Sequence, residues 1–139
     1  MSGPLNLVYP VMAQVLLALV VMVLMGQRRV KAIRRRRVRF RDIALDREGW
    51  PDDVRVVGHN LENQFETPVL FFVLCGAATY VGATGVAMTA LAWIYVILRV
   101  IHAAVHISVN DIRRAVAFAA SLIVLILMWV GVALRLIGA

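Results

Sequence analysis

Four apolar segments dominate the sequence, and each is long enough, or nearly so, to cross a lipid bilayer as a helix. They cover about residues 8–26, 56–80, 87–108 and 115–137. A spanning helix needs about 20 mainly apolar residues, with a range of about 17 to 25. Pro10 falls in the first turn of the first segment, where a missing N–H costs little. The pattern predicts a single all-α domain over residues 1–139, an integral membrane four-helix bundle.

The second segment differs from the others because its first half is polar. At about 100° per residue, its polar side chains fall on one face of a helix. Ionisable groups at membrane depth are costly, so such a group of residues is by default a candidate functional site. Pro68 follows directly and predicts a kink, or a freed carbonyl, just below the polar face. The residues of this first polar stripe are Arg55, His59, Glu62, Asn63 and Glu66.

The third segment carries a second polar stripe, within an arc of about 80° at helical pitch. Because the second segment descends from one membrane face and the third returns to it, the two stripes are expected at similar depths. We therefore predict that Glu66 and Arg99 pair, directly or through a shared polar network. By contrast, we assign Gln14, Asn60 and Gln64 to hydrogen bonds that only lock helices together. The second stripe contains Tyr95, Arg99, His102, His106, Asn110 and Arg113.

The distribution of basic residues predicts the orientation of the chain in the membrane. Eleven of the 15 basic residues lie in residues 27–55, the predicted first loop. Under the positive-inside rule this loop and the short loop at residues 110–114 are cytoplasmic, and both termini lie on the opposite side. Anionic lipid head groups are the expected partner of the basic loop, rather than nucleic acid, because Phe40 is the only aromatic residue in the arginine cluster and no nucleic-acid-binding motif is present. The single Cys75 excludes a disulfide within the chain and a Cys-rich zinc site.

Two motifs and the layout resemble one known family. These are Asn63-x-x-Glu66-x-Pro68 at the second segment, His102-x-x-x-His106 followed by Arg113, and a basic loop between the first two of four helices. The chain thus resembles the membrane-associated proteins in eicosanoid and glutathione metabolism, the MAPEG family, as a divergent member of bacterial type. The resemblance implies a homotrimer in a bacterial plasma membrane, with glutathione held between neighbouring protomers.

The resemblance also implies roles for individual residues. Asn63 and Glu66 match the family's glutathione-binding pair, and Arg113, or alternatively Arg114, matches the arginine that activates the thiol. His59 stands where glutathione-transferring members have an arginine, and His102 and His106 stand where they have tyrosines. Pro68 also follows the glutamate more closely than is usual. The expected glutathione site consists of Arg113 as the catalytic residue, with Arg55, His59, Asn63, Glu66, Arg99, His102 and His106 as binding residues.

Three functions stay open at this point. The first is a glutathione transferase or peroxidase that acts on lipophilic substrates. The second is a non-catalytic MAPEG-like protein that binds lipid or regulates a partner, which the histidine replacements favour. The third is a small proton-coupled exporter using Glu66, which is less favoured because such exporters usually carry the carboxylate in their first helix. His102, His106 and Glu66 match zinc or iron ligation only loosely, so no metal is predicted.

Overall fold

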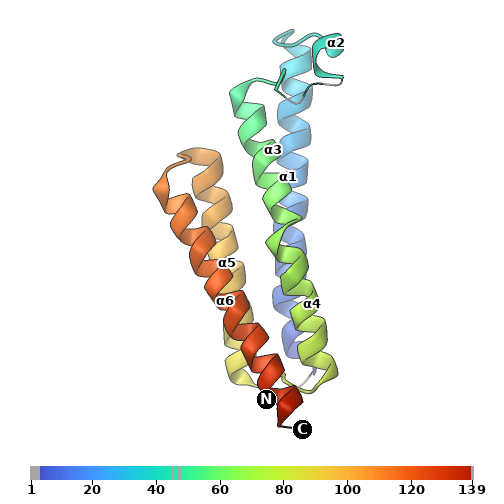
Figure 1. Cartoon of the computed structure of the whole chain (residues 1–139). Coiled ribbons are helices and arrows are strands. Elements are labelled where there is room, and N and C mark those ends of the chain that lie inside the picture. Colours follow the sequence, from blue (N-terminus) through green and yellow to red (C-terminus); the bar gives the residue numbers. More distant parts are fainter. Residues whose placement is uncertain (1–3, 45, 47, 139) are drawn as a thin grey trace.

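The computed structural model describes residues 4–44, 46 and 48–138, and this part of the chain contains helices and no strands. A short 3-10 turn, η1 (Pro4–Leu7), leads into the first long helix (Figure 1). Three helices, α1, α5 and α6, are long and apolar enough to cross a membrane. The helices are α1 (Val8–Arg34), α2 (Phe40–Ile43), α3 (Asp52–Gln64), α4 (Thr67–Tyr80), α5 (Val86–Ser108) and α6 (Ile112–Ile137).

The first helix is longer than its apolar pattern predicted. It continues to Arg34 instead of ending near residue 26, so part of the basic segment is helical rather than loop. Arginine, lysine and glutamine are good helix formers, and no proline or glycine follows Gly26 in this helix. The added turns also have a partner, because Arg28 Nη1 donates to the backbone oxygen of Asp53 at 2.7 Å. The bundle therefore extends beyond its apolar part at one end.

The second predicted segment is divided, as Pro68 suggested. α3 ends at Gln64, and α4 begins at Thr67 with Pro68 in its first turn. Proline has no N–H to donate to the carbonyl four residues earlier, so an uninterrupted helix would lose a hydrogen bond here. Tyr95 Oη donates to Thr67 Oγ1 at 3.2 Å and holds the start of α4 against α5. α4 alone, with 14 residues, is too short to be a spanning helix of ordinary length.

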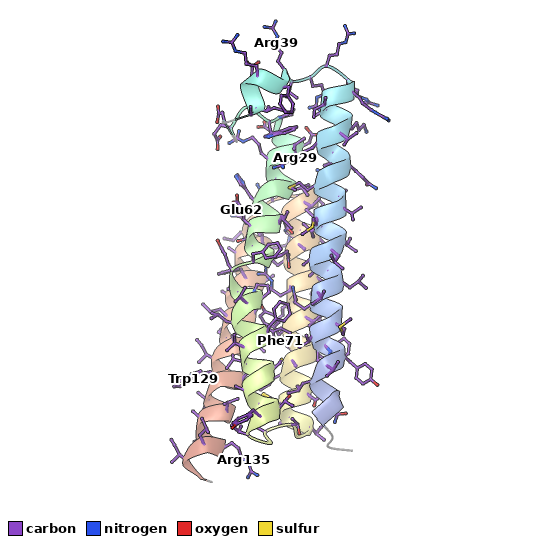
Figure 2. The ribbon with its side chains drawn as sticks, turned by 90° about the vertical axis from the view of Figure 1, so that its right-hand side faces the viewer. Arg29, Arg39, Glu62, Phe71, Trp129 and Arg135 are labelled. Atoms are coloured by element: carbon purple, nitrogen blue, oxygen red, sulfur yellow. The ribbon has the colours of Figure 1, made fainter. Side chains whose placement is uncertain are left out.

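The helices lie side by side along one axis, with both chain termini at the end opposite α2 (Figure 1). The apolar core occupies the half near the termini, where Phe71 stacks on Tyr95 with ring centroids 4.5 Å apart. Figure 2 shows Phe71 pointing among the helices, while Arg29 and Arg39 lie at the α2 end. Large apolar side chains also cover much of the outer surface, which suits lipid contact. The half near α2 is left for polar groups.

A layer of buried polar side chains joins α1 to α3. Gln14 Nε2 donates to Gln64 Oε1 at 3.0 Å, and Gln64 Nε2 donates to Asn60 Oδ1 at 3.3 Å. All three side chains are buried. The structure thus confirms an interhelical hydrogen bond for Gln14 and Gln64, worth about 0.6 to 2 kcal/mol in a membrane protein, whereas the bond between Gln64 and Asn60 lies within α3. This layer fixes the height of α3 relative to α1.

Candidate functional site

The two polar stripes meet at a pocket between α3, α5 and α6. Its volume of about 410 Å³ falls within the range of about 300 to 1,000 Å³ that is typical of small-molecule sites. Carboxylate and amide groups come from α3, and imidazole and guanidinium groups come from α5 and α6. The lining residues are His59, Glu62, Asn63, Glu66, His102, His106, Arg114, Ala115 and Phe118.

Arg99 supports this pocket from below and is not among the residues that line it. Its side chain is fully buried, and Nη2 donates to the backbone oxygen of Asn63 at 2.6 Å. The helix break frees carbonyls at the end of α3, where the helix dipole also favours a cation. Glu66 is exposed and acts on Arg99 only through electrostatic attraction. Of the two predicted arrangements, the described residues show no direct Glu66–Arg99 ion pair, and Arg99 instead donates to the backbone oxygen of Asn63.

His102 and His106 are both held by Arg114. His102 Nδ1 lies 3.1 Å from the backbone oxygen of Arg114, which can only accept, so Nδ1 carries the hydrogen. Arg114 Nη1 lies 3.1 Å from His106 Nε2, and a guanidinium can only donate, so this nitrogen accepts. The other ring nitrogens, His102 Nε2 and His106 Nδ1, are buried and have no partner among the described residues. The pocket wall thus holds one unpaired imidazole acceptor and one unpaired imidazole donor.

The two arginines that begin α6 lie in different surroundings. Arg113 is exposed and pairs with Asp111, with Nη2 2.7 Å from Oδ2. Asp111 also caps α6 by accepting from the backbone N–H of Arg113, and these hydrogen bonds hold the pKa of the Asp111 carboxyl below its usual value. Consecutive helix positions point about 100° apart. Arg114, not Arg113, therefore lines the pocket.

A second, larger pocket lies on the other side of α3, with a volume of about 930 Å³. It shares His59, Glu62 and Glu66 with the first pocket, so these side chains stand between the two. Arg55 lines only this second pocket, where it pairs with Glu48 and, at 3.3 Å, with Asp52. The structure does not bring Arg55 together with His102 and His106, although the sequence placed them in one site.

The chemistry of the first pocket suits an organic ligand of mixed charge. Among the described residues, no group of three His, Cys, Asp or Glu side chains has the geometry of a metal site. Cys75 is buried in the apolar core, away from the pocket. Glu66 and Glu62 offer negative charge on one wall, while Arg114 offers positive charge on the other. A zwitterionic or thiol-bearing molecule can satisfy both walls.

Spanning-length helices with a polar pocket between three of them define an integral membrane protein. The chain matches the sequence profile of the MAPEG family over residues 7–134, nearly its whole length, and belongs to that family. Searches among curated proteins and among solved structures gave no significant match. The family assignment made from Asn63, Glu66, His102 and His106 is thereby confirmed.

Two pocket residues were missed or misjudged from sequence. Phe118 on α6 lines the pocket, and its ring lies 5.9 Å from Arg99 Cζ, but it is one of many apolar residues in its segment. Arg114 was ranked second because Arg113, and not Arg114, continues the predicted stripe of His102 and His106. Asp111 is a favourable N-cap residue, and this signal indicates a start at Ile112.

Proposed function

We propose that this protein is a MAPEG membrane enzyme that joins glutathione to lipophilic substrates, as a glutathione transferase, or that reduces lipophilic hydroperoxides with two molecules of glutathione, as a peroxidase. The observation that carries the proposal is the opposition of charges across the 410 Å³ pocket. Glutathione has an ammonium group, two carboxylates and a thiol. Glu66 and Asn63 suit the ammonium and amide groups, and Arg114 suits the thiolate. His59, near the same wall, can donate to a carboxylate.

In the proposed reaction, Arg114 lowers the thiol pKa by stabilising the thiolate. The thiol proton goes to His102 Nε2, the unpaired buried acceptor. The sulfur then uses its electron pair to form a C–S bond with an electrophilic carbon, and the leaving group departs with the pair from the broken bond. His102 then gives the proton to the leaving group where that group is basic, or to water where it is a halide, so the enzyme returns to its starting state.

An apolar pocket directly below supports a lipophilic second substrate. It lies between α4 and α6, has a volume of about 300 Å³ and is lined by apolar side chains that include Leu70, Leu122 and Trp129. Leu70 is one helical turn below Glu66, and Leu122 is one turn below Phe118. A membrane-dissolved electrophile in this pocket would approach the thiolate from the apolar side, while glutathione enters from water.

We further propose that the working form is a homotrimer with sites between protomers and that the α2 end faces the cytoplasm of a bacterial cell. Exposed apolar surface and the open second pocket support association, and the basic residues near α2 support the orientation. In a Cys75→Ala background, cysteines at Arg41 and at Tyr80 should label from opposite sides of the membrane. Cross-linking in mild detergent should give three chains, and a stable monomer would contradict the trimer.

A non-catalytic, lipid-binding role is the second candidate, and one observation favours it. His106 accepts a hydrogen bond from Arg114, so the guanidinium is partly engaged before any ligand arrives. Purified protein in lipid nanodiscs separates the two functions. Transferase function predicts saturable glutathione binding, a thiolate absorbance near neutral pH and conjugation of chlorodinitrobenzene. Absence of binding and of that absorbance would reject the transferase and leave the lipid-binding role.

A further inference from the structure

We propose that the outer face of α1, at the boundary between membrane and water, binds one anionic phospholipid of the adjoining leaflet. A groove of about 560 Å³ lies on this face. Its lower wall includes Val23 and Val30, and its upper rim consists of Lys31, Arg34 and Arg35. The proposal is separate from the transferase function, because none of these residues lines the pocket between α3, α5 and α6.

Six of the basic residues near α2 fall into two sets, and the first set is structural. Arg37 makes two hydrogen bonds to the carboxylate of Asp53, at 3.2 and 2.9 Å, and these hold the pKa of Asp53 below its usual value. Arg28 donates to the backbone of the same residue, and Arg29 lies over the ring of Trp50 at 5.1 Å. These arginines already have protein partners and tie the end of α1 to α3.

The second set is Lys31, Arg34 and Arg35, which form the rim of the groove. Their side chains are exposed and have no hydrogen-bond or ion-pair partner among the described residues. Positions three and four apart lie on the same helix face, so the three cations are neighbours. Like charges that crowd together without an acceptor favour an anion between them. A phosphate group meets that need.

The groove continues into an apolar track along α1. A neighbouring groove of about 430 Å³ shares Val23 and Gln27 with the first and extends it along Leu16, Leu19 and Val20. Gly26 opens the upper groove, because a Cβ at this position would meet no atom within 4 Å. Cations at one end of an apolar track match a phospholipid, with its phosphate at the rim and an acyl chain below. Free phosphate has no apolar part that could occupy the track.

Charge also argues against a second copy of the chain as the occupant. Eleven of the 15 basic residues lie in residues 27–55, so a copy packed side by side at the same depth would bring further cations against a rim that already holds three. The homotrimer proposed above would then use another face of the chain. The inner leaflet of a bacterial membrane instead supplies negative charge at this depth. An anionic phospholipid is therefore the occupant that the groove fits.

The test uses two triple variants with equal loss of charge. The first changes Lys31, Arg34 and Arg35 to glutamine, and the control changes Arg36, Arg39 and Arg41 to glutamine, which are exposed and outside the groove. Native mass spectrometry would follow titration of the detergent-purified full chain with phosphatidylglycerol and with phosphatidylcholine. We expect the wild type to prefer phosphatidylglycerol, the rim variant to lose about tenfold or more in affinity, and the control to stay within about twofold.

Several results would overturn the proposal. Equal loss in both triple variants would indicate diffuse charge attraction, and equal affinity for the two lipids would remove the role of the head group. Displacement of the lipid by inorganic phosphate would show an anion site without an acyl track. A change in the mass of the assembly in the rim variant would show an interface between copies. Gly26→Leu keeps the charge but fills the groove, so unchanged lipid affinity in this variant would also contradict it.

Discussion

α3 and α4 come from one continuous segment of the chain, yet they perform opposite tasks. α3 carries polar side chains to the pocket and is fixed through hydrogen bonds of Asn60 and Gln64. α4 is apolar and contributes Phe71 and Cys75 to the core. The break between them provides a backbone carbonyl, that of Asn63, to which buried Arg99 donates. The comparison shows how a helix break lets ionisable groups lie at membrane depth beside an intact apolar core.

The largest expected effect concerns the arginine that stabilises the thiolate in the pocket. Arg114→Ala should slow conjugation of glutathione by about a hundredfold to a thousandfold, because one positioned donor to a developing charge is worth about 3 to 4 kcal/mol. Arg113→Ala is the matched control, since Arg113 is paired with Asp111 outside the pocket. It should change the rate by less than about threefold. Steady-state rates in nanodiscs give both numbers, and the reverse order would return the role to Arg113.

The next prediction tests the proton acceptor in the polar half. His102→Gln keeps a polar side chain at this position but cannot take a proton, so conjugation at neutral pH should fall by about tenfold or more. The rate of this variant should rise with pH as solvent ionises the thiol, whereas the wild-type rate should level off. A parallel loss at every pH, with an unchanged profile, would mean that His102 only positions Arg114.

A third prediction compares the two partners that were expected to form a pair. Arg99→Met leaves the end of α3 without its buried donor. A hydrogen bond from a charged group is worth about 1.5 to 3 kcal/mol, so the free energy of unfolding should fall by that amount. Glu66→Gln should change stability by less than about 1 kcal/mol, since Glu66 is exposed, but should weaken glutathione binding. Similar destabilisation by both variants, with strong coupling in the double variant, would restore the direct pair.

The smallest expected effect lies outside the membrane, where Arg37 holds Asp53. The folded-state pKa of Asp53 is lowered, first by its hydrogen bond to Arg37, so its stabilising contribution is present above the unfolded-state pKa of about 4. It is lost as pH falls through the lower folded-state pKa. Asp53→Asn should therefore remove a small acid-sensitive part of the stability and leave stability at neutral pH only slightly reduced. Thermal melts of both proteins at neutral and acidic pH would show it.

Much of the fold followed from patterns that the sequence displays directly. The apolar segments and Pro68 predicted the helical membrane class and the break after α3, and the motif around Asn63 and Glu66 predicted the family. The pairing of Arg99 was not predictable in the same way, because its acceptor is a backbone carbonyl that becomes available only after the break. The end of α1 was misjudged because its last turns are polar, carry no apolar periodicity and contact α3 through the hydrogen bond from Arg28 to the Asp53 backbone.

The direction in which side chains point near the start of α6 was also difficult to predict from the sequence. An error of a few residues in the start of α6 does not alter which residues are apolar, but it hides the capping role of Asp111 and so the difference between Arg113 and Arg114. Of the proposed binding residues, His59, Asn63, Glu66, His102 and His106 meet at one pocket, whereas Arg55 lies at the second. The depth of these residues in the membrane could be estimated from the sequence. The side of α3 on which each one lies could not.

The most direct test of this account is an electron cryo-microscopy density map of the protein in nanodiscs with glutathione added. The account predicts density for glutathione between α3, α5 and α6, with its sulfur beside the Arg114 guanidinium and its ammonium group near Glu66. Density for glutathione beside Arg55 on the opposite side of α3, or none in either pocket at saturating glutathione, would contradict it.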